Sequence, residues 1–396
     1  MKVDVLLGLQ WGDEGKGKVV DVLTPKYDVV ARFQGGPNAG HTLEFKGEKY
    51  VLRSIPSGIF QGGKINVIGN GVVLDPVLLK EEAEVLAASG HDITKQLYIS
   101  KKAHLILPTH RILDAAYEAA KGAGKIGTTG KGIGPTYTDK ISRNGVRVGD
   151  LLRDFDSIYS AAKARHEAIL KSLNYDYDIT ELEAKWFDAL NYLKQFKLID
   201  SEHFINNLLK DGKNVLAEGA QGTMLDVDFG SYPFVTSSNP SIGGVCTGSG
   251  VGARDIGEVY GVLKAYSSRV GAGPYVTEQN NEIGDTIREL GHEYGTTTKR
   301  PRRCGWLDLV ALKYAVRLNG ITGLAVNHVD TIGKLDNIKL CVAYNCNGKE
   351  TTDFSTNVDF LNNSYAVYED FDGNFGDISN CKSFEELPDN AKKYFE

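Results

Sequence analysis

Residues 3–18 read VDVLLGLQWGDEGKGK, and this stretch decides the fold of the chain. Its first part, Val3–Leu9, is rich in valine and leucine and predicts a short strand. The apolar spacing over Lys16–Leu23 predicts a helix. A strand that runs through glycines into a helix N-terminus offers backbone N–H groups and the positive end of the helix dipole to an anion. The sequence therefore predicts a phosphate site on an α/β scaffold.

From Gly12 the loop fits the pattern G-x4-G-K of phosphate-binding loops, and Lys16 and Lys18 supply positive charge. Val19 stands where that pattern has a serine or threonine, whose hydroxyl normally binds magnesium. Another oxygen must take its place, and the carboxylate of Asp13 inside the loop is the candidate. The alternative is a glycine-rich surface turn with incidental charges, in which Asp13 caps the following helix.

Short β-rich runs and helical patterns alternate beyond this loop. The strand-like runs are Val29–Phe33, Tyr50–Leu52 and Ile65–Ile68, and the helical patterns are Pro76–Ala88 and Ile112–Lys121. This alternation favours a large, mostly parallel central sheet with flanking helices. Residues 151–210 are rich in Ala, Leu, Lys and Glu and predict a helical insertion. Because no change in composition marks a linker, we expect one α/β domain over residues 1–396.

Composition excludes several classes of protein. The net charge of −6 lacks the basic excess of a protein that coats nucleic acid. The five cysteines form no CxxC pair, which argues against a disulfide framework and a structural zinc site. No stretch approaches the roughly 20 apolar residues of a membrane span, and Asp4 interrupts the N-terminal apolar run. We therefore expect a cytoplasmic protein that binds neither membrane nor nucleic acid.

Six motifs are spread over nearly the whole chain, at Gln10–Lys18, Gly35–Thr42, Gly127–Pro135, Glu218–Thr223, Val235–Asn239 and Arg300–Trp306. Together, and in this order, they resemble the adenylosuccinate synthetase family. The resemblance implies a ligase of de novo AMP biosynthesis. Such an enzyme joins L-aspartate to inosine monophosphate (IMP) while GTP is hydrolysed to GDP and phosphate, through a 6-phosphoryl-IMP intermediate. The resemblance further implies one Mg²⁺ per subunit and a homodimer.

The chemistry explains why such an enzyme needs acid–base residues. The 6-oxo group of hypoxanthine leaves poorly, but phosphorylation turns it into a good leaving group that an amine displaces. The resemblance implies that Asp13 is the base at the purine N1 and a magnesium ligand, and that the Gly40 carbonyl is the second magnesium contact. It implies that His41 is the acid near the transferring phosphoryl group. Asp21 is a candidate to orient that ring, and the alternative for Asp21 is a solvated position on the helix surface. The predicted catalytic residues are Asp13, His41, Lys16 and Gln221.

The resemblance also assigns the residues that bind IMP. Arg143 corresponds to an arginine that reaches the IMP phosphate of the neighbouring subunit. Taken alone, threonine and glutamine in loops are more often solvated or turn-capping, and an arginine at a helix edge is ordinarily a solvated cation. The predicted IMP contacts are Asp13, Glu14, Gly15, Lys16, Asn38, Ala39, Gly40, His41, Thr129, Arg143, Gln221, Thr236 and Arg300.

A short basic segment is the predicted aspartate site. It holds four cations within five residues, at positions 299–303. Such a run also suits nucleic acid, but it is short, interrupted by Pro301 and set in an acidic protein, so a dicarboxylate fits it better. Lys299 stands where the family commonly has glycine, which predicts a stiffer or differently shaped loop. The predicted aspartate contacts are Thr296, Thr297, Thr298, Lys299, Arg300, Pro301 and Arg302.

The resemblance places the guanine base at Asp330, whose carboxylate suits the N1–H and the 2-amino group of guanine. His328 and Val329 depart from the Lys-Leu that the family more often has. The family continues past the last predicted helix, Asp389–Glu396, into a loop that completes the guanine pocket, so we expect a C-terminal segment to be missing after residue 396. The predicted GTP contacts are Gly12, Asp13, Glu14, Gly15, Lys16, Gly17, Lys18, Gly40, His41, Thr42, Arg302, His328, Val329 and Asp330.

Three alternatives stay open at this point. One is a GTP-dependent switch or binding module without ligase chemistry, for which the His41 motif and the basic segment have no use. A second is a (2-amino)adenylosuccinate synthetase that acts on a guanylate, a class that typically lacks the loop carboxylate that Asp13 supplies here. A third is a relative that has lost its activity.

Overall fold

The opening stretch folds as its sequence predicts. Strand β1 (Val3–Gly8) is followed by a loop and then by helix α1 (Lys16–Leu23). In the loop Gly12, Asp13 and Gly15 have left-handed backbone angles, with φ of 88°, 61° and 87°. Glycine adopts this region without steric cost, and aspartate tolerates it better than most residues. The loop therefore turns sharply enough to join the strand to the helix.

The computed structural model describes residues 1–38, 40–45, 47–122, 127–295 and 300–396. The chain divides into two compact units. Unit 1 comprises Met1–Leu7, Lys16–Gln221 and Thr236–Tyr260, and unit 2 comprises Gly8–Gly15, Gly222–Val235 and Gly261–Glu396. Most of the phosphate loop thus belongs to unit 2, and the helix that follows it belongs to unit 1. No helix of the described residues is long and apolar enough to cross a membrane.

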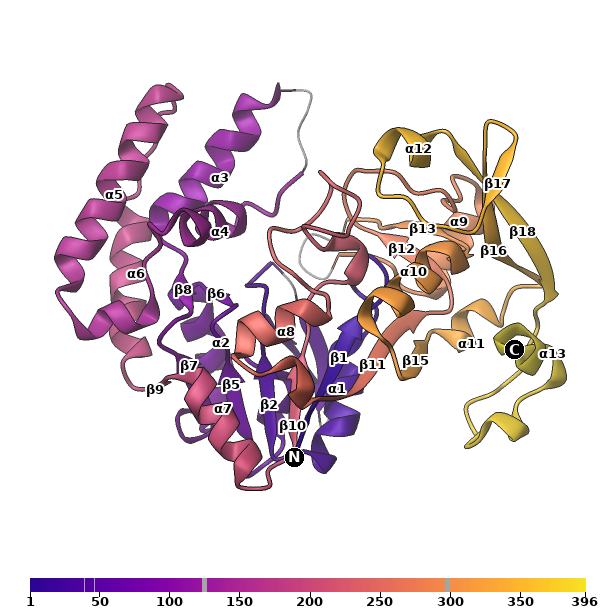
Figure 1. Ribbon diagram of the computed structural model, residues 1–396, viewed down its shortest axis with the longest axis horizontal. Coiled ribbons are helices and arrows are strands. Elements are labelled where there is room, and N and C mark those ends of the chain that lie inside the picture. Colours follow the sequence, from indigo (N-terminus) through magenta and orange to yellow (C-terminus); the bar gives the residue numbers. More distant parts are fainter. Residues whose placement is uncertain (39, 46, 123–126, 296–299) are drawn as a thin grey trace. The chain divides into compact units, whose positions relative to one another are not determined.

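The predicted large, mostly parallel sheet is confirmed. It has eight strands in the order β15-β11-β1-β10-β2-β5-β7-β9. In this order, the neighbouring strands β1, β10, β2, β5, β7 and β9 all pair parallel (Figure 1). Strands β2 and β10 are buried along their whole length, as the near-continuous apolar runs of a parallel sheet require. The bounds are β2 Val29–Arg32, β5 Ile65–Ile68, β7 Leu97–Ser100, β9 Lys197–Ile199, β10 Val215–Glu218, β11 Ile256–Lys264 and β15 Gly323–Asn327.

Two predicted elements differ in detail. The run Tyr50–Leu52 lies in β4 (Glu48–Leu52), which pairs antiparallel with β3 (His41–Phe45) and not with the parallel sheet. A connection as short as the one between β3 and β4 permits only an antiparallel hairpin, since parallel strands need a crossover of a dozen or more residues. Helix α3 (Pro108–Ala120) begins four residues before the predicted start, because Pro108 is a favourable first helical residue.

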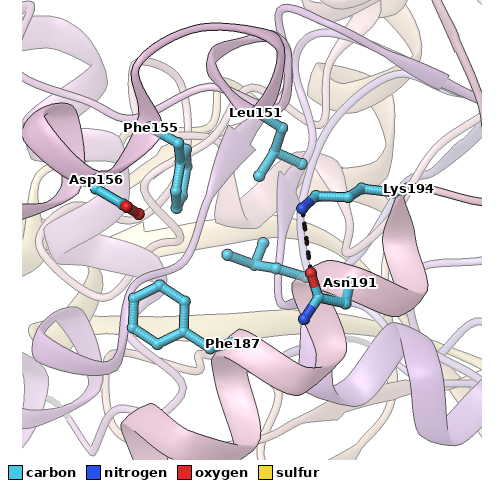
Figure 2. Close-up of a pocket in the computed structure, with 7 residues that line it drawn as sticks. Leu151, Phe155, Asp156, Phe187, Asn191 and Lys194 are labelled. Carbon is cyan, nitrogen blue, oxygen red and sulfur yellow. Dashed lines mark hydrogen bonds between the residues drawn. The ribbon is translucent and has the colours of Figure 1, made fainter.

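Residues 151–210 contain helices α5 (Phe155–Ser172), α6 (Thr180–Leu193) and α7 (Ser201–Lys210), together with the edge strand β9, which the composition does not reveal. Helix α3 contacts both α5 and α4 (Ile133–Ser142), as Figure 1 shows. A small pocket beside α5 and α6 contains none of the predicted site residues (Figure 2). Its lining is Leu151, Phe155, Asp156, Phe187, Leu190, Asn191 and Lys194.

Unit 2 has its own core and a second, smaller sheet. The core includes Trp11 from the phosphate loop, Tyr266 and Trp306. In the sheet, β16 pairs parallel with β14 and antiparallel with β17 and β18. The bounds in unit 2 are β12 Ser267–Arg269, α9 Glu282–Leu290, β13 Arg303–Gly305, β14 Leu307–Asp308, α10 Leu309–Asn319, α11 Val329–Ile332, β16 Asn337–Cys346, β17 Lys349–Thr351, α12 Val358–Asn362, β18 Ser364–Asp372 and α13 Asp389–Phe395. In unit 1 the remaining elements are β6 Val73–Leu74, α2 Pro76–Ala88, β8 His104–Leu105 and α8 Ile242–Ser249.

Candidate active site

The phosphate loop is held in shape by its own glutamate. The Glu14 side chain is fully buried, and its Oε1 accepts the backbone N–H of Gln10 at 3.1 Å and of Gly12 at 2.9 Å. A Cβ on Gly222 would collide with the Gln10 carbonyl and with this carboxylate, so only glycine fits there. The Glu14 carboxylate therefore faces into the loop, and it stabilises the loop rather than presenting a charge to a ligand.

Asp13 stands at the outside of the same loop. Its side chain is 38% exposed, and its Oδ2 lies 2.9 Å from Nε of Arg302. The left-handed backbone at residue 13 turns the carboxylate away from the buried face where Glu14 sits. Two adjacent acidic residues thus have opposite environments. Only Asp13 is placed to meet a solvent-borne substrate or ion.

The segment after β15 also contacts the loop. The Asn327 amide donates from Nδ2 to the carbonyl of Glu14 at 2.6 Å, and it packs so closely that a Cβ on Gly15 would lie 2.8 Å from the same nitrogen. His328 follows with a left-handed φ of 61°. Val329 is half-buried and Asp330 is exposed. The residues predicted to bind guanine therefore share unit 2 with the loop carboxylate Asp13.

His41 is oriented by a buried glutamate in unit 1. Its Nδ1 lies 2.6 Å from Glu218 Oε1, and the second oxygen of Glu218 accepts the backbone N–H of Ser57 at 2.8 Å. The hypothesis that Asp21 orients this ring is wrong, because Asp21 instead accepts a hydrogen bond from Gln61 at 3.2 Å. Glu218 lies at the carboxyl end of β10, 177 residues away in sequence, so local spacing could not reveal it.

The second ring nitrogen of His41, Nε2, is available for a ligand. Burial and the nearby charges of Arg32 and Lys16 lower the pKa of His41, and the hydrogen bond to Glu218 opposes them only in part. The neutral ring donates from Nδ1 to Glu218. His41 is only 7% exposed, yet its Nε2 has no hydrogen-bond partner among the described residues. Gly17 of α1 is needed here, since a Cβ on it would lie 2.9 Å from the Cβ of His41.

The predicted IMP contacts Asn38 and Gln221 lie together. Gln221 donates from Nε2 to Asn38 Oδ1 at 3.1 Å. The backbone of Gln221 is left-handed, with φ of 56°, and its buried Oε1 has no partner among the described residues. Gly35 packs against the same side chain, so closely that a Cβ on Gly35 would lie 3.1 Å from Gln221 Oε1. The pair offers an amide oxygen and further N–H donors to a polar ligand.

The remaining predicted residues of unit 1 lie around α4 and in the loops. Thr129 is exposed before α4, and Arg143 is exposed at its C-terminal cap with a left-handed φ of 67°. Thr236 is half-buried. Lys16 is buried at the start of α1, whereas Lys18 is exposed. Gly40 is exposed just before β3.

Some predicted residues cannot be placed. Ala39 and the four residues from Thr296 to Lys299 lie outside the described residues. Most of the predicted aspartate segment is therefore not described. Of that segment Arg300 and Pro301 are exposed, and Arg302 is half-buried beside Asp13.

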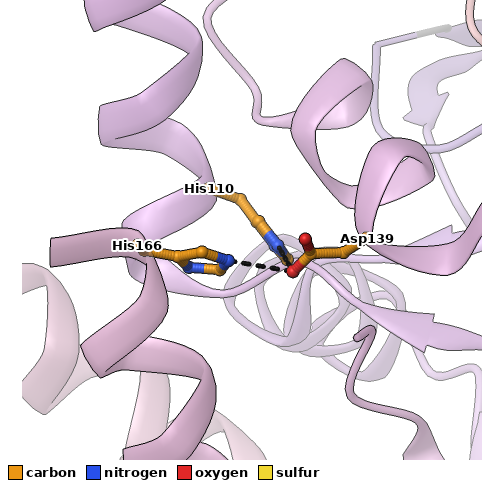
Figure 3. Close-up of side chains that lie close together, drawn as sticks. All are labelled: His110, Asp139 and His166. Carbon is orange, nitrogen blue, oxygen red and sulfur yellow. Dashed lines mark hydrogen bonds and ion pairs between the residues drawn. The ribbon is translucent and has the colours of Figure 1, made fainter. Parts of the chain in front are cut away.

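Helix α4 is fixed by a buried network that the sequence did not suggest. Asp139 of α4 accepts from Nε2 of His110 at 3.0 Å and from Nε2 of His166 at 2.9 Å, both on one carboxylate oxygen (Figure 3). Nδ1 of His110 accepts the backbone N–H of Leu107 at 3.0 Å, so the ring proton is on Nε2. The three side chains are close enough to hold a metal ion, but that proton on Nε2 of His110 favours a hydrogen-bonded clamp between α3, α4 and α5.

This clamp predicts an acid-sensitive stability. Burial lowers the pKa of His110 to about 4, against 6.5 for an unperturbed histidine. Between these two pKa values the unfolded chain binds more protons than the folded chain. The contribution of His110 to the free energy of unfolding is therefore fully present above pH 6.5 and decreases as the pH falls below it. His110 contributes a loss of about 2 kcal/mol between pH 7 and pH 5. We expect urea unfolding of His110→Gln to show a correspondingly shallower pH dependence than the natural chain.

His104 also contributes to the pH dependence of unfolding, in the natural chain and in His110→Gln alike. Burial lowers its pKa to about 3, so it gives both proteins a pH dependence of the same sign. Equal pH dependence of the two unfolding free energies would show that His110 does not titrate as its burial requires.

Sequence reasoning missed the residues that support the site from a distance. Glu293, Lys264 and Tyr266 of unit 2 form a buried polar group behind Arg302, and Asn327 holds the phosphate loop. The one available signal was the presence of acidic and basic residues within otherwise apolar strand-like runs, as at Lys264. Such a signal marks a buried charge that needs a partner, but it does not say which one.

Comparisons with known proteins give a consistent result. The family model described as adenylosuccinate synthetase matches residues 5–396. Adenylosuccinate synthetase of Parabacteroides distasonis is 72% identical over 100% of this chain and 93% of its own length, and that of Bacteroides thetaiotaomicron is 66% identical with the same coverage. The solved structure of fully ligated adenylosuccinate synthetase from Plasmodium falciparum is 41% identical, with a TM-score of 0.93 over 100% of this chain and 93% of that one.

Proposed function

Because the chain belongs to the adenylosuccinate synthetase family, whose members make adenylosuccinate from IMP and L-aspartate with GTP, we propose specific roles for its residues in that reaction. The chain is a GTP-dependent ligase of purine biosynthesis. The observation that carries the assignment of its chemistry is the contrast between two neighbouring carboxylates. Glu14 is committed to the loop, whereas Asp13 is partly exposed and faces outward.

In the first step Asp13 accepts the N1 proton of IMP. The electron pair released on the ring passes to O6, which attacks the γ-phosphorus of GTP as the bond to the β-phosphate oxygen breaks, and GDP leaves. In the second step the neutral amine of aspartate attacks C6, phosphate leaves with the O6 atom, and the attacking nitrogen loses one proton to the departing phosphate. An exposed carboxylate suits the first step, because it is accessible to the purine base.

His41 serves the transferring phosphoryl group. Its Nε2, which has no partner among the described residues, is the atom that meets the ligand. Glu218 at Nδ1 and the phosphoryl oxygens at Nε2 together favour the protonated ring, which donates from Nε2 as negative charge accumulates on those oxygens. Lys16 adds a positive charge for the phosphates. Gln221 and Asn38, held to each other, hydrogen-bond IMP.

Mg²⁺ fits the oxygen donors that the chain offers. The Asp13 carboxylate and the Gly40 carbonyl are hard oxygen ligands of the kind that magnesium prefers, and both residues are exposed. When bound, the ion neutralises negative charge on the nucleotide phosphates. The remaining nucleotide contacts are the loop from Gly12 to Lys18, Thr42, Arg302 and the segment from His328 to Asp330. Arg302 also binds a carboxylate of the aspartate substrate.

The IMP phosphate is bound by Thr129, Thr236 and, from a second copy of the chain, Arg143. Arg143 is exposed at the end of α4 in a backbone conformation that arginine rarely adopts, and Asp139 of the same helix is clamped by two histidines. Such rigid support around an exposed cation favours a recognition role over a solvated one. We therefore propose a homodimer in which each Arg143 serves the neighbouring site.

Mixing two inactive variants tests the shared site. Arg143→Leu and Asp13→Ala subunits, each alone nearly inactive, are expected to recover up to about a quarter of the natural activity when mixed and allowed to exchange, because a mixed dimer contains one site with both natural residues. Activity is measured against each variant mixed with itself. No recovery in samples shown to contain mixed dimers would contradict a site completed by Arg143.

The ligase assignment is tested by leaving out one component at a time. Purified enzyme is assayed with IMP, aspartate, GTP and Mg²⁺, and adenylosuccinate and phosphate are both measured. We expect product only with all components present. Net GTP hydrolysis that does not depend on IMP would favour a nucleotide switch, and turnover of a guanylate in place of IMP would favour the related ligase class.

A further inference from the structure

Arg302 lies between two carboxylates of unit 2, and only one of them belongs to the predicted site. Its Nε is 2.9 Å from Asp13 Oδ2, and its Nη1 donates to Glu293 Oε2 at 2.8 Å. The Glu293 side chain is only 1% exposed. Glu293 is therefore an inner, fixed partner of the guanidinium, and Asp13 is an outer one at the loop surface.

Glu293 is itself held on every side. Its Oε1 accepts from the ammonium of Lys264 and from the hydroxyl of Tyr266, the latter at 2.6 Å. Gln10 of the phosphate loop fixes the backbone of both partners, accepting the N–H of Lys264 at 3.0 Å and donating to the carbonyl of Tyr266 at 2.9 Å. Burial alone would raise the pKa of Glu293, but the charges of Lys264 and Arg302 outweigh it and lower the pKa to about 2.

The backbone of Arg302 is anchored by the same neighbours. Its N–H donates to the carbonyl of Glu293 at 2.9 Å, and its own carbonyl accepts from Nε of Arg288 at 2.8 Å. The side chain is only 13% exposed. Main chain and guanidinium are thus fixed together, which leaves Arg302 few orientations.

One edge of the guanidinium is left for a further acceptor. Although Nε of Arg302 is close to Asp13, its N–H makes no hydrogen bond of good geometry with any described residue. A buried donor without an acceptor is costly, and a carboxylate is the acceptor whose shape matches the planar fork of arginine. The Nε–H lies beside Asp13 without a well-aligned hydrogen bond, so this edge of the guanidinium suits a carboxylate ligand.

We infer that Glu293 is a positioning residue, which holds the inner edge of Arg302 so that its outer edge receives a carboxylate of the aspartate substrate. This inference rests on the proposed function, in which Arg302 binds aspartate. The buried group of Glu293, Lys264 and Tyr266 orders the arginine before the substrate arrives. Aspartate then binds without first having to fix a long, flexible side chain.

Glu293→Gln tests this role, because glutamine keeps the size of the side chain and removes its charge. We expect the KM for aspartate to rise about 10- to 100-fold, the range expected for a lost charge-assisted hydrogen bond. The KM for IMP and the kcat at saturating aspartate should stay within about threefold, since bound aspartate restores the orientation of Arg302.

Glu278→Gln is the matched control. Glu278 binds the neighbouring Arg303 through two nitrogens, with Nε of Arg303 at 2.7 Å from Glu278 Oε1, and this pair is more exposed than that of Glu293 and Arg302. Among the described residues, no hydrogen bond or ion pair joins Glu278 or Arg303 to Asp13. The control should leave the KM for aspartate within about twofold. Thermal unfolding of both variants separates a loss of stability from a loss of orientation.

The outcomes separate the inference from the proposed function. If Glu293→Gln leaves the KM for aspartate unchanged, as Glu278→Gln should, or raises the KM values for aspartate, IMP and GTP together, Glu293 is only structural and the inference is wrong. If the natural enzyme forms product without aspartate, the proposed function itself fails. Should Glu293→Gln not fold, Glu293→Asp, which keeps the charge but shortens the side chain, is measured with the same expectation and the same criterion.

Discussion

Asp13→Asn is expected to lower kcat about 10²- to 10⁴-fold, the range for loss of a positioned general base. An amide in place of the carboxylate has nearly the same shape but cannot accept the N1 proton of IMP. The KM values for aspartate and IMP should change much less, because the lost interaction acts in the transition state. Steady-state kinetics with each substrate varied in turn measures the effect.

Asparagine is the right replacement for structural reasons. Residue 13 has a φ of 61°, and asparagine, like aspartate, tolerates this left-handed region. Alanine at the same position would add backbone strain, so a loss of activity in Asp13→Ala alone would be ambiguous. A kcat of Asp13→Asn within tenfold of the natural value would exclude Asp13 as the base.

His41→Gln is expected to lower kcat by about 10²- to 10⁴-fold as well. The imidazole is buried, its Nδ1 is bound to Glu218, and its Nε2 has no partner among the described residues, which leaves this nitrogen available to the proposed ligand. A glutamine amide occupies similar space but does not take up a proton. Single-turnover measurements of GDP formation report on the step that this residue serves.

Two further variants decide what orients His41. Glu218→Gln should lower kcat at least about tenfold, because it weakens the hydrogen bond that fixes the ring. Asp21→Asn should have near-normal kcat, because Asp21 contacts Gln61 and not His41. The reverse order of effects would show that the ring is held by Asp21 during the reaction.

Local sequence patterns predicted most of the fold. The glycine-rich junction after Val3–Leu9 predicts a strand, a loop and a helix because each element depends on neighbouring residues, and the structure has β1, the loop and α1 at those positions. The edge strand β9 was missed because it is only three residues long and lies among helices. The hairpin of β3 and β4 likewise depends on pairing, which composition does not encode.

Local sequence patterns could not predict the contacts that support the site, because these contacts join distant parts of the chain. His41 and Glu218 are 177 residues apart, and Asn327 and Glu14 are 313 apart. Four predicted site residues, Asp13, Arg143, Gln221 and His328, have left-handed φ angles that the sequence did not predict. Backbone strain of this kind persists only where the surroundings enforce it, and it clusters at functional sites. Asn174, His292, Asn347 and Asn374, which lie outside the predicted site, also have left-handed φ angles, so this feature accompanies the site residues without identifying them.

The family assignment narrows the alternatives left open by the sequence. A chain that matches adenylosuccinate synthetases over its whole length is a ligase and not a nucleotide switch.

Positional isotope exchange tests the central claim most directly. GTP labelled with ¹⁸O in the bridge between the β- and γ-phosphates is incubated with enzyme, Mg²⁺ and IMP but without aspartate. If Asp13 removes the N1 proton and O6 takes the γ-phosphoryl group, the label scrambles into the non-bridging β-positions of recovered GTP, and this scrambling requires IMP and is lost in Asp13→Asn. Scrambling that is unaffected by Asp13→Asn, or none in an enzyme that turns over with aspartate, would contradict it.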